Sequence, residues 1–167
     1  MRIFLTTVFC CLLGIASASA EGLRPGASIA FFGISFIDTS TEGAVNGVRE
    51  DETERLKMLE DYVASRLTER GFELVDVSPV ETEINRVANV ADCNFCDVLM
   101  ARKLGADYSA VGEVQKVSNL ILSMNLVFRD AEEGQHVRGM SVDIRGNNDD
   151  SWRRGMRYIL KNNVFRE

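Results

Sequence analysis

The chain has 167 residues, of which 46% are hydrophobic, and this suits one globular domain with a sizeable core. It carries 19 Lys and Arg residues against 25 Asp and Glu residues, a formal net charge of −6. This acidic balance argues against general nucleic-acid binding.

The first twenty residues predict a secretory signal peptide. Arg2 precedes an apolar run from Ile3 to Ile15, and Ala18-Ser19-Ala20 suits a signal peptidase. The run is too short to remain in a bilayer as a permanent helix. We therefore expect cleavage after Ala20, a periplasmic location and no integral membrane segment in the mature chain. Residues 21–27 would form a short arm, and residues 28–165 a single domain.

The first half of the domain alternates strands with helices. Residues 28–38 are apolar on both alternating faces, which predicts a central strand covered on both sides. In this pattern Ile29, Phe31 and Ile37 point one way, and Ala30, Phe32, Ile34 and Phe36 point the other. The following segments predict a loop over 39–49, a helix over 50–70, a strand over 72–78, a short helix or turn over 81–89 and a helix over 96–104.

The second half predicts three successive strands and a closing helix. The strands span 108–117, 120–130 and 136–145, and the helix begins at Asp149 or Asp150 and runs to about Val164. The element order β-α-β-α-β-β-β-α predicts an α/β (α+β) fold with one mixed five-stranded sheet and helices packed against it. We expect parallel pairing among the first three strands and an antiparallel meander among the last three.

Cys93 and Cys96 stand two residues apart just before a predicted helix. An oxidising compartment favours a structural disulfide, which would stabilise the fold by only about 2 kcal/mol because the loop is short. A catalytic dithiol is the alternative, since a helix start lowers a thiol pKa. The strand order lacks the thioredoxin arrangement, however, and Asp92 and Asp97 would oppose a thiolate. A zinc site is disfavoured, because zinc needs four ligands and His136 is the only other soft ligand besides the two cysteines.

The last helix carries the main candidate surface. Arg153, Arg157 and Lys161 recur at helical spacing, with Arg154 beside them and Arg145 at the preceding strand end. These residues form either a solvated face or a basic patch for an acidic partner, lipid headgroups or a glycan. Trp152 is expected to anchor the helix to the sheet. The candidate surface as a whole comprises Arg145, Trp152, Arg153, Arg154, Arg157, Lys161, Gln115 and Lys116, the last two at a strand end near a hairpin.

Several segments together resemble a known family. They are IAFFGI, ERGFELVD, ARKLGADY, AVGEVQKV and LVFRD, followed by a closing helix. This series resembles the amino-terminal α/β domain of TolB and related curli-secretion and cell-wall-synthase-activator lipoprotein domains. VQKVSNLILSMNLVFRD and SVDIRGNNDDSWRRGMRYIL resemble a family of short secreted proteobacterial proteins of unassigned function. The resemblance implies a periplasmic domain that works in or near envelope assembly, and it implies no reaction.

The sequence thus favours a non-catalytic interaction domain whose partners are envelope proteins. It contains no G-x-S-x-G motif, phosphate-binding glycine loop or metal-ligand cluster, so we expect no enzyme activity, cofactor or metal. Two alternatives remain open at this point: a thiol-disulfide oxidoreductase that uses Cys93 and Cys96, and an anion or small-ligand binder at the region from Arg145 to Arg157.

Overall fold

The structure, a computed structural model, describes residues 22–166. The predicted signal peptide, residues 1–20, and its cleavage site after Ala20 lie outside the described residues, and both stay predictions. The described part begins in the short arm that precedes the first strand.

One mixed five-stranded sheet forms the centre of the domain, in the order β2-β1-β3-β4-β5. Strand β1 pairs in parallel with β2 and β3, and β3, β4 and β5 form an antiparallel meander. This arrangement confirms the predicted fold class, the order of the elements, the parallel pairing and the meander. The strands are β1 (Ser28–Asp38), β2 (Glu73–Leu74), β3 (Tyr108–Ser118), β4 (Ile121–Asp130) and β5 (His136–Arg145).

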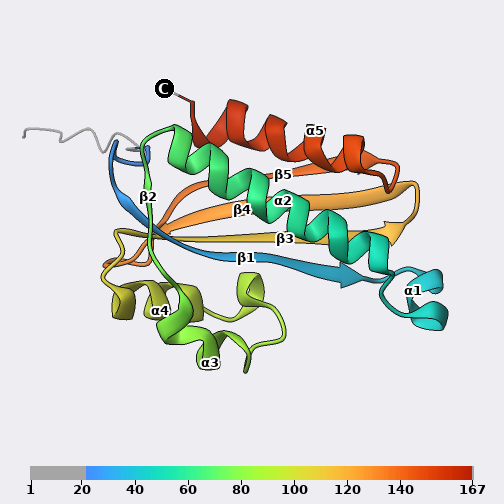
Figure 1. Ribbon diagram of the computed structural model, residues 1–167, viewed down its shortest axis with the longest axis horizontal. Helices are drawn as coiled ribbons and strands as arrows, with labels where there is room; N and C mark the ends of the chain where they lie inside the picture. Colours follow the sequence, from blue (N-terminus) through green and yellow to red (C-terminus); the bar gives the residue numbers. More distant parts are fainter. Residues whose placement is uncertain (1–21, 167) are drawn as a thin grey trace, which may run out of the picture.

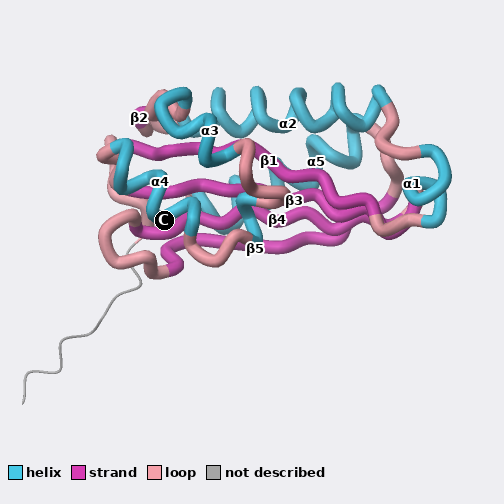
Figure 2. Tube along the Cα trace, turned by 90° about the horizontal axis from the view of Figure 1, so that it is seen from below, coloured by secondary structure: helices cyan, strands magenta, loops and turns pink. Residues whose placement is uncertain are grey.

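Helices cover the two faces of the sheet unequally. On one face, α2 (Glu50–Glu69) and α5 (Asp149–Ile159) lie side by side along the strands (Figure 1). On the other face, α3 (Glu81–Ile84) and α4 (Cys96–Leu104) cover one end only (Figure 2). The larger core lies under α2 and α5, where Trp152, Phe128 and Leu59 are fully buried. A smaller core lies under α4.

Three local predictions differ from the structure. The predicted loop 39–49 contains a helix, α1 (Thr41–Asn46), because the Ser40 hydroxyl caps it by accepting a hydrogen bond from Gly43 N. The predicted strand 72–78 shrinks to Glu73–Leu74, because Asp76 binds Ser78 and turns the chain into a 3₁₀ turn. Helix α5 ends at Ile159 and continues as a π-helical turn, Leu160–Val164.

A bulge in β1 changes which side chains share a face. The pairing of β1 with β3 shifts between Phe31 and Ile34, where Gly33 has a φ of +80°. The strict alternation predicted from the sequence is therefore wrong beyond this point. Ile34 joins Ile29 in the core under α2 and α5, instead of facing the same way as Ala30. The bulge also brings Asp38 beside Lys116 of β3 in the strand pairing.

We predict that Gly33→Ala destabilises the protein more than Gly71→Ala does. Both glycines have a positive φ, so alanine costs each about 1–2 kcal/mol. Only at Gly33 would the added Cβ meet a neighbour, because it would lie 2.7 Å from Glu60 Oε1. That oxygen accepts a hydrogen bond from Ile34 N at 2.9 Å, whose loss costs about 1 kcal/mol more. Urea unfolding measures both variants, and equal losses would contradict the bulge's role.

Candidate functional site

The Lys116 ammonium group is buried at the end of β1 and β3 among three carboxylates. Its Nζ lies 2.7 Å from Glu52 Oε1, 3.1 Å from Asp38 Oδ2 and 3.2 Å from Glu42 Oε2. Lys116 and Glu52 are both 0% exposed. These contacts join β3 to β1, α1 and α2, so the ion cluster fixes four elements at one point.

Asn147 extends this cluster to the last helix. Its Nδ2 donates to Glu52 Oε1 at 2.6 Å, and its Oδ1 accepts from Trp152 Nε1 at 3.0 Å. Trp152 is itself 0% exposed, which agrees with its expected anchoring of α5 to the sheet. The prediction that Lys116 and Trp152 belong to an interaction surface is therefore wrong, because both side chains are buried in the interior.

The cluster keeps its groups charged. Burial alone would lower the pKa of Lys116, but its hydrogen bonds to Glu52, Asp38 and Glu42 raise that pKa above its ordinary value. Burial likewise opposes the ionised form of Asp38, yet hydrogen bonds from Ser40 and Lys116 hold its pKa below the usual range. The Asn119 side chain and Lys116 lower the pKa of Glu42. These groups therefore stabilise the fold as ions and are not poised for proton transfer.

We predict that Lys116→Met lowers the free energy of unfolding by about 3–5 kcal/mol, because it leaves buried carboxylates without a counter-charge. Lys103→Met is the matched control: Lys103 pairs with Glu83 at the surface, where a pair is worth about 0–1 kcal/mol. The double variant Lys116→Met with Glu52→Gln should lose less than Lys116→Met alone. Urea unfolding provides the measurement, and equal losses for the two single lysine variants would contradict the cluster.

Cys93 and Cys96 form a disulfide at the start of α4, with their Cα atoms 5.5 Å apart. The two residues between them, Asn94 and Phe95, both have positive φ angles, and the Phe95 side chain is exposed. Asp97 is buried and paired with Arg129 at 2.8 Å and Ser109 at 2.7 Å. Asp97 therefore ties α4 to β3 and β4 instead of facing the thiols as a free charge.

We predict that replacing Cys93 and Cys96 by Ser lowers the free energy of unfolding by about 2 kcal/mol, the loop-closure effect of so short a bridge. The wild-type protein should not reduce insulin, and its disulfide should have a reduction potential below about −300 mV. Turnover of insulin combined with a more oxidising potential would instead support the oxidoreductase alternative.

The structure divides the basic residues predicted from the last helix into two groups. Arg145 and Arg154 line a groove between the edge strand β5 and α5, together with Ser151 and Tyr158. Arg157 of α5 and Lys161 of the π-helical turn that follows lie on the side that faces α2. Arg153 points to the same side, where its Nη2 lies 3.0 Å from Met58 Sδ. Gln115 is half-buried, on the sheet face opposite Lys116.

The α2–α5 groove gathers cations from both helices. It is lined by Tyr62, Arg66, Arg70, Arg157, Leu160, Lys161 and Phe165. No acidic side chain is among them, and within the groove's four cations only Arg66 forms a salt bridge in the described chain, with Glu69. Arg66 and Arg70 are not among the site residues predicted from the sequence. Their spacing of four residues on the predicted helix 50–70 was a usable signal, but the pairing of this helix with the last one was not visible.

Two classes of feature are not found in residues 22–166. No helix there is long and apolar enough to cross a membrane. No group of three or more His, Cys, Asp or Glu residues in that range is arranged to hold a metal ion.

The fold of this domain is similar to that of two solved structures. The C-terminal domain of LpoB from Salmonella enterica matches with a TM-score of 0.51 at 14% identity, over 75% of this chain and 87% of that one. Lipoprotein GNA1162 from Neisseria meningitidis matches with a TM-score of 0.53 at 17% identity, over 81% and 94%. At these identities the likeness shows the fold alone.

The chain belongs to the DUF3280 family, described as "protein of unknown function", whose model matches residues 27–164. This confirms the predicted membership in a family of unassigned function, and the likeness in fold to LpoB and GNA1162 agrees with the predicted resemblance to lipoprotein domains. No curated protein matches the chain significantly.

Proposed function

We propose that the protein is a non-catalytic interaction domain of the bacterial envelope, exported to the periplasm and folded as one unit over residues 28–165. The α2–α5 groove would bind an acidic segment of an envelope protein. The observation that carries this proposal is the set of four cations, Arg66, Arg70, Arg157 and Lys161, around a groove that no carboxylate of residues 22–166 lines. On a chain of net charge −6, such a concentration favours an acidic partner.

The groove also offers apolar contacts between its charges. Tyr62, Leu160 and Phe165 line it, and the Phe165 ring lies under the Arg70 guanidinium at 4.8 Å. An acidic segment with interspersed apolar residues would match this alternation. Aromatic and arginine side chains are the types most enriched among the residues that dominate binding energy at protein interfaces.

The buried charged side chains and the cysteines of the domain stabilise its fold, which supports a non-catalytic role. Lys116 and its carboxylates hold the interior, Asp97 is paired with Arg129, and the two cysteines are bonded to each other. The neighbour GNA1162 is a lipoprotein by its title, and a binding role near the envelope is compatible with that likeness.

We predict that a photocrosslinking residue placed at Tyr62, in the α2–α5 groove, captures an envelope protein in living cells. The charge reversals Arg157→Glu and Lys161→Glu should abolish the crosslink, because they turn the groove's cations into repelling anions. The matched control reverses Arg145 and Arg154, which line the other groove, and should leave the crosslink intact.

A second probe at Tyr158, which lines the β5–α5 groove, separates the two surfaces. Two results would overturn the assignment of the α2–α5 groove. One is a crosslink from the Tyr62 probe that persists after Arg157 and Lys161 are reversed. The other is a crosslink that forms from the Tyr158 probe only.

A further inference from the structure

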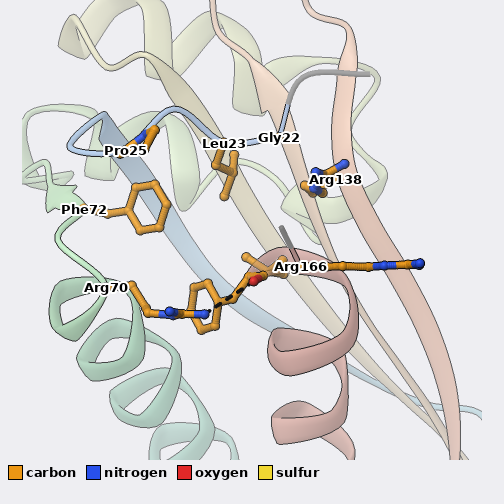
Figure 3. Close-up of a pocket in the computed structure, with 9 residues that line it drawn as sticks. Gly22, Leu23, Pro25, Arg70, Phe72, Arg138 and Arg166 are labelled. Atoms are coloured by element: carbon orange, nitrogen blue, oxygen red, sulfur yellow. Dashed lines mark hydrogen bonds between the residues drawn. The ribbon is translucent and has the colours of Figure 1, made fainter. Parts of the chain in front are cut away.

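A second basic pocket lies where the two ends of the described chain meet. It has a volume of about 380 Å³ and is lined by residues of the N-terminal arm, the end of α2, the start of β5 and the C-terminal turn. Figure 3 shows Arg70 and Phe72 on one side of the opening and Arg138 and Arg166 on the other, with Leu23 and Pro25 above. The pocket adjoins the α2–α5 groove, because Arg70 and Phe165 line both.

Three arginines in this pocket have unused hydrogen-bonding capacity. The Arg138 Nε is buried and has no hydrogen-bond partner among the described residues. The Arg138 guanidinium rests against Gly22, where a Cβ would lie 2.5 Å from its Nη2. Arg70 donates to the Phe165 carbonyl at 3.3 Å but forms no salt bridge in the described chain, and Arg166 is exposed. Among residues 22–166, no acidic residue lines the pocket.

This donor set suits a phosphate group. Each arginine presents several N–H donors in a planar fork, which matches the oxygen atoms of a phosphate or a carboxylate. The Arg138 Nε has no partner among the described residues but is itself buried, so an anion would bind the other N–H groups of these arginines.

The same pocket is apolar between its charges. Leu23, Pro25, Phe72, Val164 and Phe165 share its lining with the arginines, and Phe72 itself packs into the core. A free inorganic anion would use only the arginines. A phospholipid headgroup would place its phosphate on the arginines and its glycerol and first methylene groups against the apolar side chains.

The predicted signal peptide would hold this end of the domain near a membrane until it is cleaved. Gly22, which lines the pocket, follows the apolar run from Ile3 to Ile15, with only residues 16–21 between them. Even fully extended, such a connection reaches at most about 25 Å. Before the predicted cleavage, the pocket would therefore stay close to the bilayer that holds the apolar run.

We propose that the pocket formed by Arg70, Arg138 and Arg166 binds the phosphate of an anionic phospholipid headgroup, so that this end of the domain docks on the membrane surface. The site goes beyond the proposed partner groove, since it depends on Arg138 and Arg166 instead of Arg157 and Lys161. The acidic remainder of the domain would be repelled by the same surface, which orients the basic end toward it.

The test measures sedimentation of the protein, residues 21–167, with vesicles of phosphatidylcholine alone or mixed with phosphatidylglycerol. The wild type should bind the mixed vesicles at least about tenfold more tightly. Arg138→Gln with Arg166→Gln should remove at least about tenfold of that affinity, since each arginine near an anionic surface contributes roughly fivefold. Arg145→Gln with Arg154→Gln, which removes two arginines of the β5–α5 groove, should stay within about twofold of the wild type.

Three results would overturn the proposal. Equal binding to both kinds of vesicle would show that phosphatidylglycerol is not recognised. Equal losses in the two double variants would show attraction by overall charge instead of by the pocket. Displacement from the vesicles by inorganic phosphate at the concentration of accessible lipid, or by a poly-glutamate peptide at that concentration, would assign the pocket to a free anion or to protein carboxylates. Matching thermal unfolding of the variants excludes loss of fold as the cause.

Discussion

The Lys116 ammonium group holds together one whole end of the domain. It lies at the point where β1 and β3 finish, and its carboxylate partners come from β1, α1 and α2. Through Glu52 and Asn147 the same network reaches the loop before α5 and the indole of Trp152. Two charges taken out of water cost several kcal/mol each unless both are paired and hydrogen-bonded, so only one mutual arrangement of these elements is acceptable. The position of α5 against α2, and hence the groove between them, depends on this arrangement.

The charge of the domain is distributed unevenly, and the fold is the reason. The carboxylates around Lys116 occupy one end of the sheet, whereas Arg70, Arg138 and Arg166 come together at the other, beside both ends of the described chain. Helices α2 and α5 run in the same direction, so the last turn of each helix lies at the basic end (Figure 1). Cations near a helix C-terminus are favoured by the helix dipole, so this clustering is also compatible with stable helices. A chain that is acidic overall can thus present one strongly basic pole.

Membership in the DUF3280 family and the likeness to LpoB and GNA1162 establish the fold. Any difference in function between proteins with this fold would lie in surface sites such as the grooves. The disulfide belongs to the scaffold in this view. It closes a loop of few residues at the start of α4, where Asn94 and Phe95 adopt left-handed conformations that are unfavourable for side chains with a Cβ. A covalent bridge holds that turn in place, while the buried pair of Asp97 and Arg129 fixes the helix that follows.

The sequence by itself determined the order of elements, the mixed sheet and most strand boundaries, because hydrophobic periodicity and turn residues are local signals. Lys116 follows Val114 by two residues, so the alternation of the strand puts both side chains on the same face. This signal indicates that Lys116 is buried, but the prediction from the sequence did not include it. Tertiary structure alone decided the rest. The bulge at Gly33 reversed the facing of half of β1, the Lys116 cluster needed four elements to meet, and the basic pole joined arginines from α2, β5 and the chain end. Such contacts join residues far apart in the chain, so no local pattern encodes them.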